Sequence, residues 1–282
     1  MESRDIAVAI DFSAPSMTAL RWAARLAREA GSVVRPLHVI DTVGPGPGPR
    51  ELLRPEQRSI VDALTADALA RWQAFRKDVP EAADFVLEVE VADRRGGLRR
   101  LLERCPAGVL VLGATGTGSP NVGIGSFAAA AVRDVPTDVL IVREGHALRW
   151  SGVAVGLDFS PAAERALDAA AAFAARDGVR LHVVHVAGPF FTDSDIAGAR
   201  LAEALATVRA RHPGLETGAV IHRRVGARAG LVEFSEKVGA DLIAIGRRGA
   251  GGAHDFLLGS TAEHVLRDTQ CAVWVAKPPR PD

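Results

Sequence analysis

A glycine-rich stretch near the end of the chain, GRRGAGGAHDFLLGS (residues 246–260), has the residue types and spacing of an anion-binding loop. Two residues separate Gly246 from Gly249, and nine more separate Gly249 from Gly259 and Ser260. Glycine lets backbone N–H groups approach a ligand with no Cβ atom in the way. Exposed N–H groups that lead into a helix N-terminus form a cradle for phosphate. The stretch therefore predicts a phosphate site.

The same residues also fit a purely structural role. Ser260 followed three residues later by Glu263 is the pattern of a helix capping box, which needs no ligand. Arg247 could pair with a phosphate, although arginines in loops are usually solvated. Both readings stand together, because a capping hydroxyl can also contact a bound phosphate.

A shorter version of the stretch, GATGTGSPNVGIGS, occupies residues 113–126. The pair Gly113 and Gly116 keeps its spacing, but only eight residues separate Gly116 from Gly125 and Ser126. No acidic residue stands three positions after Ser126. This loop is therefore one residue shorter and less conventionally capped than its longer counterpart.

Two aspartates could complete such sites. Asp11 and Asp158 each end an apolar run and begin the tripeptide Asp-Phe-Ser. A carboxylate there could accept hydrogen bonds from ribose hydroxyls or from nearby backbone N–H groups, and the sequence leaves both open. Ser160 before Pro161 fits a helix N-cap followed by proline at the first helical position. His38, like its counterpart His185, is interpreted as a strand-end histidine with satisfied hydrogen bonds rather than a base or metal ligand.

The composition argues against several classes of protein. The 34 basic and 34 acidic residues balance, whereas a dedicated nucleic-acid or membrane-surface binder would carry a basic excess. The sequence holds two cysteines and lacks a signal-type N-terminus, a run of about 18 apolar residues, a P-loop, and the GxGxxG, GxSxG and HExxH motifs. We therefore expect a cytoplasmic protein.

The chain repeats itself. IAVAIDFSAPSMTALRWAARLA (residues 6–27) resembles VAVGLDFSPAAERALDAAAAFA (residues 153–174), and Asp158 follows Asp11 by 147 positions. The glycine-rich stretches match near the end of each copy. Two homologous domains follow, residues 1–146 and 147–282.

Each copy alternates short apolar runs with helical patterns, which predicts βαβ units and a parallel sheet covered on both faces. In the second copy the strands are expected near 152–158, 179–186, 217–222, 241–246 and 271–276. The helices are expected near 161–177, 194–211, 228–238 and 260–268. Ligands of such sheets bind beyond the carboxyl ends of the strands, where the strand order reverses. The aspartate and the glycine-rich stretch of each copy would then face one crevice.

These features together resemble the universal stress protein family: the strand ending in Asp-Phe-Ser, the LHV second strand, the ADLIAIG fourth strand and the Gly-x2-Gly-x9-Gly-Ser stretch. The resemblance covers nearly the whole chain, in tandem. It implies an α/β fold of two Rossmann-like (adenine nucleotide alpha hydrolase-like) domains, each with a five-stranded parallel sheet of order 3-2-1-4-5. It also implies ATP, with or without Mg²⁺, as the cofactor.

The resemblance assigns a role to each matching position of the second domain. Asp158 would contact the ribose, and the backbone at two strand ends the adenine. The adenine positions are Gly156 and Val186, and the ribose and phosphates would be held by Gly246, Arg247, Gly249, Gly259, Ser260 and Thr261.

In the first domain the same resemblance implies a second site with some departures from the pattern. Its positions are Asp11, Ala9, Val39, Gly113, Gly116, Gly125 and Ser126. The shorter loop and Phe127 in place of Thr261 weaken the match at the phosphate end. We expect the second site to be the better one.

The leading hypothesis is a nucleotide-dependent regulator or sensor in stress response, with at most slow ATP hydrolysis. The alternatives are a hydrolase or nucleotidyl-transferring enzyme, for which His254 and Asp255 are the local candidates, and a nucleotide-free scaffold for partner proteins. The resemblance further implies that the last strands, residues 139–142 and 272–276, pair the domains as a pseudo-dimer, with a homodimer as a further option. Neither a nucleic acid nor a membrane is expected as a partner.

Overall fold

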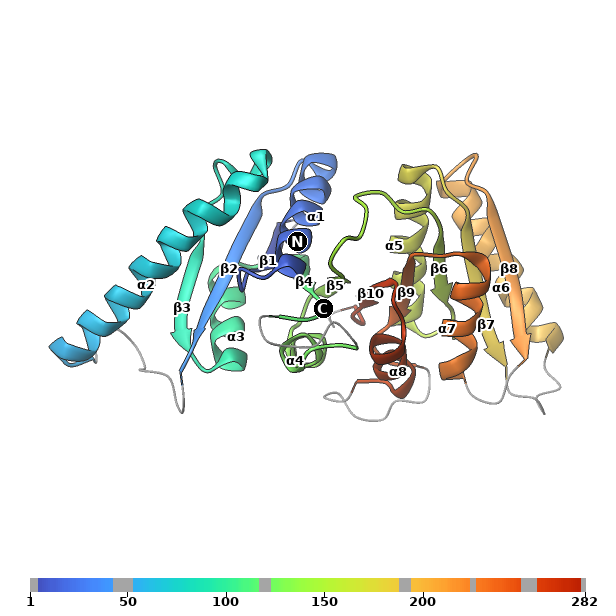
Figure 1. Ribbon diagram of the computed structural model, residues 1–282. Helices are drawn as coiled ribbons and strands as arrows, with labels where there is room; N and C mark the ends of the chain where they lie inside the picture. The colour runs from blue at the N-terminus through green and yellow to red at the C-terminus, as the bar shows by residue number, and fades with distance from the viewer. Residues whose placement is uncertain are drawn as a thin grey trace. The chain divides into compact units, whose positions relative to one another are not determined.

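The computed structural model describes residues 5–42, 53–116, 123–187, 194–223, 227–249 and 258–279. The chain divides into two compact units, unit 1 (residues 1–148) and unit 2 (residues 149–282). Figure 1 shows strands and helices alternating within each unit. The predicted α/β fold is confirmed.

Unit 1 contains five strands and four α-helices among its described residues. The strands are β1 (Ile6–Ala9), β2 (Val34–Asp41), β3 (Glu88–Ala92), β4 (Val109–Gly113) and β5 (Asp138–Val142). The helices are α1 (Ala14–Ala30), α2 (Pro55–Phe75), α3 (Arg94–Arg104) and α4 (Ser126–Asp134), with two short 3₁₀ turns, Arg76–Asp78 and Pro80–Ala82, after α2.

Unit 2 repeats this order. The strands are β6 (Val153–Gly156), β7 (Leu181–Ala187), β8 (Thr217–Arg223), β9 (Leu242–Gly246) and β10 (Ala272–Ala276). The helices are α5 (Pro161–Asp177), α6 (Ser194–Arg211), α7 (Ala227–Val238) and α8 (Ser260–Asp268).

The strands of each unit are parallel, and their order is the one the resemblance implies. In unit 1, β1 pairs with β2 and β4, while β3 and β5 lie outside them. In unit 2, β6 pairs with β7 and β9, while β8 and β10 lie outside. Each sheet therefore has the order 3-2-1-4-5, and the order reverses between β1 and β4 and between β6 and β9.

Helices cover both faces of each sheet, so the strands can be apolar throughout. In unit 1, α1 packs on β1 and β4, whereas α3 packs on β2, β3 and α4. Right-handed crossovers place α1 and α3 on opposite faces. Every residue of β5 is buried, and so is every residue of β10. Strands buried along their whole length read as continuous apolar runs, as the sequence shows here.

The first helix of each unit starts at a serine cap, as the sequence predicts for Ser160, and ends at a glycine. The Ser13 and Ser160 hydroxyls each accept a hydrogen bond from an N–H in the first turn of α1 or α5. Each helix ends at a left-handed glycine, Gly31 (φ 62°) or Gly178 (φ 66°). Serine caps and glycine stops fix where each helix starts and ends relative to the preceding strand.

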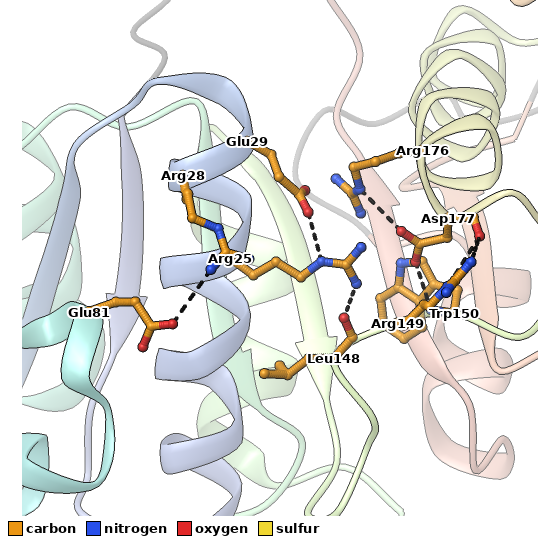
Figure 2. A network of polar contacts seen from close by, with 9 residues as sticks. All are labelled: Arg25, Arg28, Glu29, Glu81, Leu148, Arg149, Trp150, Arg176 and Asp177. Carbon is orange, nitrogen blue, oxygen red and sulfur yellow. Dashed lines mark hydrogen bonds and ion pairs between the residues drawn. The ribbon is translucent and has the colours of Figure 1, made fainter.

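Polar contacts hold the chain on either side of the junction between the units (Figure 2). Within unit 1, Arg25 of α1 pairs with Glu29 at 2.8 Å and donates to the Leu148 carbonyl. Within unit 2, the Trp150 N–H donates to Asp177 Oδ2 at 2.7 Å, and the Arg149 guanidinium donates to the Asp177 carbonyl at 2.7 Å. Each unit therefore anchors its own end of the connection on its first helix.

Across the residues that the structure describes, no helix combines the length and the apolar character that crossing a membrane requires.

Candidate functional site

A cavity of about 330 Å³ lies at the carboxyl edge of the unit 1 sheet, beyond β1, β2 and β4. This volume is within the range of small-molecule sites. The start of α4 and side chains from α2 and α3 complete its walls. All seven residues that the sequence assigns to the first site line it: Ala9, Asp11, Val39, Gly113, Gly116, Gly125 and Ser126. Residues separated by more than 100 positions in the chain thus meet around one cavity.

The aspartate of each unit has two differently used oxygens. Asp11 Oδ1 accepts the Ser13 N–H at 3.0 Å and the Ser13 hydroxyl at 2.5 Å. Asp11 Oδ2 lies against Gly116, so close that a Cβ there would collide with it. The bond to Ser13 holds the carboxylate orientation, and the second oxygen is directed toward the glycine-rich loop.

Unit 2 repeats this arrangement. Asp158 Oδ1 accepts the Ser160 N–H at 3.0 Å and the Ser160 hydroxyl at 2.6 Å. A Cβ on Gly249 would stand 2.5 Å from Asp158 Oδ2. The backbone role of the aspartate is therefore confirmed through Oδ1, while Oδ2 faces the loop and the contact with ribose stays a prediction.

The first glycine of each loop is required by the helix next to it. A Cβ on Gly113 would stand 2.7 Å from Pro15 Cβ, and one on Gly246 would stand 2.8 Å from the backbone nitrogen of Ala163. Real Cβ atoms essentially never come so close to backbone atoms. The absence of a side chain lets β4 and β9 end directly against the N-terminal turns of α1 and α5.

The predicted capping box at Ser260 is wrong. Gly259, with extended backbone angles, is the N-cap of α8, and Ser260 is the first helical residue with an exposed side chain. No side chain makes a cap hydrogen bond at this helix. The Gly259 N–H instead donates to the Arg247 carbonyl at 2.9 Å, which sets the helix start one residue earlier than the capping box requires.

The start of α4 has the same geometry, although its loop is one residue shorter. Gly125 is the N-cap, its N–H donates to the Ala114 carbonyl at 2.7 Å, and Ser126 is the exposed first helical residue. Arg143, directly after β5, donates from Nη1 to the Gly123 carbonyl at 2.8 Å. The same backbone bond, from the N-cap glycine to the carbonyl directly after the strand, thus joins the described ends of both loops.

The other assigned residues of unit 2 lie at the carboxyl ends of β6, β7 and β9 or in the first turn of α8. Gly156 is the last residue of β6, and Val186 is the last residue but one of β7. Arg247 follows β9 and donates its N–H to the Ala276 carbonyl at 2.7 Å. Thr261 is half-buried in α8, where unit 1 has Phe127. His254 and Asp255 lie outside the described residues, as does most of the loop between Gly249 and Gly259.

His38 and His185 are satisfied strand histidines, as interpreted from the sequence. Each Nδ1 lies close to the carbonyl before the aspartate: His38 to Ile10 at 2.7 Å and His185 to Leu157 at 2.8 Å. A carbonyl only accepts, so Nδ1 carries the proton and donates. Burial lowers the pKa of His38 below 6.5, against the hydrogen bond to Ile10, which raises it. His38 is therefore neutral near pH 7.

Sequence reasoning missed the phenylalanine of each Asp-Phe-Ser turn and an arginine that covers it. Phe12 (φ 63°) and Phe159 (φ 62°) are the non-glycine residues with positive φ in the described chain. Arg71 of α2 lies over the Phe12 ring, and Arg200 of α6 lies over the Phe159 ring. The identical tripeptide in both copies signals the turn, but no sequence pattern connects it to these arginines.

The described residues contain no group of three or more histidine, cysteine or acidic side chains placed to hold a metal ion.

Comparisons with known proteins place this geometry in a family. The universal stress protein family model matches residues 2–143 and again residues 151–277. A universal stress protein of Mycolicibacterium smegmatis is 29% identical over 295 residues, which span 97% of each chain. The universal stress protein Rv2623 of Mycobacterium tuberculosis is 29% identical over 306 residues, covering 98% of this chain and 97% of its own.

A solved structure shows the same fold over the full length. The crystal structure of a universal stress protein from Archaeoglobus fulgidus superposes with a TM-score of 0.73 at 22% identity, covering 99% of this chain and 100% of that one. The two family matches coincide with the two structural units, one match in each. The chain therefore belongs to the universal stress protein family and carries two of its domains in tandem.

Proposed function

We propose that this protein binds ATP in each of its two domains, residues 1–146 and 147–282, and acts as a nucleotide-dependent regulator or sensor in stress response. The observation that carries the proposal is the cavity of unit 1, because all seven assigned residues line it. Its volume and its place beyond the reversal of strand order suit a nucleotide.

The ribose end of the site would be formed by the aspartates. Asp11 and Asp158 are already oriented by their serines through Oδ1. Their Oδ2 atoms, which face Gly116 and Gly249, would accept hydrogen bonds from ribose hydroxyls. The adenine would lie at the strand ends, against the backbone of Ala9 in unit 1 or Gly156 in unit 2, with Val39 or Val186 beside it.

The phosphate end would be formed by the glycine-rich loops and the helix starts beyond them. Gly113, Gly116 and Gly125 bring backbone close to the cavity in unit 1, and a side chain at Gly116 would collide with Asp11 Oδ2 there. The N-termini of α4 and α8 favour negative charge. Ser126 and Ser260 are exposed at these termini, so their hydroxyls would contact phosphate. Mg²⁺, where present, would bind with the phosphates.

The second site remains the one we expect to bind more tightly. Thr261 can add a hydroxyl where Phe127 cannot, and the longer loop keeps the nine-residue spacing of the family pattern. Arg247, between β9 and the loop, would add a guanidinium to the phosphates. The similar helix starts of α4 and α8 support a functional first site as well.

A binding role fits the geometry better than catalysis. His38 and His185, next to the Asp-Phe-Ser turns, each have one ring nitrogen held by a backbone carbonyl. The proposal therefore includes at most slow hydrolysis. It also keeps pairing of the domains through their last strands, further dimerisation, and a cytoplasmic location, to which the free thiols of Cys105 and Cys271 are suited.

The test is to release and identify nucleotide that co-purifies with the protein, and to measure turnover of added ATP. The proposal expects adenine nucleotide in the wild-type protein and much less in Asp158→Ala, with turnover well below about one per second. Turnover well above that rate would favour an enzyme. Absence of nucleotide, with no rise in melting temperature on adding ATP, would favour a scaffold and overturn the proposal.

A further inference from the structure

The phenylalanine after each aspartate has a backbone conformation that its neighbours must maintain. Phe12 has φ 63° and Phe159 has φ 62°, in the left-handed region that side chains with a Cβ rarely adopt. Residues in this region persist when the surroundings hold them, and they cluster at functional sites. The strain occurs at the same place in both units, directly after the proposed ribose contact.

A histidine and an arginine hold each ring. In unit 1, the His38 ring lies 4.8 Å from the Phe12 ring, and Arg71 Cζ lies 4.3 Å from the same ring centroid. In unit 2, the corresponding distances from Phe159 are 5.0 Å to His185 and 4.1 Å to Arg200. The arginines come from α2 and α6, helices with otherwise different sequences.

These contacts restrain the residues directly before and directly after the aspartate in the chain. The histidine Nδ1 also donates to the carbonyl of the residue that precedes the aspartate, Ile10 or Leu157. The turn at the phenylalanine lets the serine, two positions after the aspartate, donate to the aspartate Oδ1. The carboxylate orientation therefore depends on the turn, and the contacts of the ring with its histidine and its arginine support the turn.

Unit 2 isolates the role of the arginine. Phe12 has an additional edge contact with Phe75 at 5.6 Å, whereas the ring contacts of Phe159 within the described chain are His185 and Arg200. Loss of Arg200 would leave His185 as the ring contact of Phe159 within the described chain.

We propose that Arg200 is a positioning residue for nucleotide recognition: its guanidinium holds the left-handed Phe159 and so fixes Asp158, which contacts the ribose. Arg71 packs on Phe12 in the same way and also lines the first cavity. The inference rests on the proposed function and deepens it. Because the arginine acts through the aspartate, its removal weakens recognition of the ribose hydroxyls and leaves other contacts to the nucleotide unchanged.

The experiment compares ATP with 2′,3′-dideoxy-ATP by isothermal titration calorimetry in an Asp11→Ala background, which leaves the second site to be measured. Arg200→Ala should lower the preference for ATP by roughly two- to fivefold, the size of one exposed cation–π contact, with unchanged affinity for the dideoxy compound. Arg200→Lys should keep part of the preference, since an ammonium also lies favourably over a ring. Arg211→Ala, on the same helix and paired with Asp168, is the matched control and should change neither affinity.

The outcomes separate this inference from the function it rests on. Binding of ATP with an unchanged preference in Arg200→Ala, or an equal loss for both compounds, would overturn the positioning role alone. A wild-type protein that binds both compounds equally would also overturn it, because the aspartate would then make no ribose contact. A wild-type protein that binds neither would overturn the proposed function, and the inference with it. If Arg200→Ala does not fold, Arg200→Gln in the same background removes the charge over the Phe159 ring and gives the same comparison.

Discussion

Asp158 and Ser160 bond each other twice, through the Ser160 N–H at 3.0 Å and the Ser160 hydroxyl at 2.6 Å, both to Asp158 Oδ1. The same hydroxyl also accepts the Ala163 N–H at 3.3 Å, which caps α5. One side chain therefore fixes the start of a helix and the orientation of a carboxylate. Asp11 and Ser13 repeat the arrangement in unit 1.

This relationship predicts that Ser160, at the start of α5, contributes more to stability than Ser260, at the start of α8. Ser160→Ala should lower the free energy of unfolding by about 1 kcal/mol, the usual cost of losing an N-cap. Ser260→Ala should change it by less than about 0.5 kcal/mol, because Ser260 is exposed and makes no cap hydrogen bond. Urea denaturation of both variants measures the difference. Equal losses of stability in the two variants would contradict the structure and support a capping role for Ser260.

The close packing of β9 against α5 makes Gly246 intolerant of a side chain. Gly246→Ala places a Cβ 2.8 Å from the Ala163 nitrogen, so we expect overpacking to cost about 1–3 kcal/mol of stability. Gly198→Ala is the matched control, since no atom lies within 4 Å of a Cβ there and the residue is inside α6. The control should leave stability unchanged or raise it by about 0.5–1 kcal/mol. Thermal unfolding of the two variants gives the comparison, and equal melting temperatures would contradict it.

His38 should make stability depend on pH in a defined direction. Burial lowers its folded pKa below 6.5, with Arg71 lowering it further and the Ile10 carbonyl and Asp11 opposing. The folded state then binds fewer protons than the unfolded state. The stability that neutral His38 contributes is therefore fully present above about pH 6.5, and the free energy of unfolding falls as the pH drops below that value.

The variant His38→Asn tests this origin, because asparagine can still donate to Ile10 but does not titrate. We expect a smaller loss of stability between about pH 7.5 and 5.5 than in the wild type. His182, whose pKa burial also lowers, would keep its own share of the dependence. An unaltered slope in urea titrations across this range would show that His38 does not contribute.

The anchor at the start of unit 2 depends on a fully buried carboxylate (Figure 2). The Asp177 side chain has 0% exposure and accepts the Trp150 N–H at 2.7 Å. Asp177→Ala removes the acceptor of a buried donor and should cost about 1–3 kcal/mol. Asp168→Ala removes an exposed partner of Arg211 and should cost less than about 1 kcal/mol. Denaturation followed by tryptophan fluorescence compares them, and similar costs would contradict a role for the anchor.

The fold was largely predictable because its signals are local and repeated. Helices expected at 161–177, 194–211 and 260–268 have those bounds in the structure, and α7 begins one residue before the expected 228. The strand at 152–158 is shorter, Val153–Gly156, because the ladder with β7 ends where the chain turns into Asp-Phe-Ser. Alternating apolar patterns and capping residues carry this information without tertiary contacts.

The site was predictable in part. The seven residues around the first cavity were named from the resemblance to the family, position by position. The left-handed phenylalanines, the arginines over them and the glycine N-cap of α8 were not, because each depends on contacts between distant segments. Arg71 reaches Phe12 from 59 positions away, and the Gly259 N–H is bonded by a carbonyl 12 positions earlier.

The most direct test of the account is calorimetric titration of ATP into the wild-type protein and into the double variant Asp11→Ala/Asp158→Ala. The account predicts saturable binding by the wild type and an affinity at least about tenfold weaker in the double variant, since a hydrogen bond to a charged group is lost at each site. Circular dichroism of the double variant would verify that it remains folded. Wild-type protein that shows no binding, or a folded double variant that binds ATP as tightly as the wild type, would contradict the account.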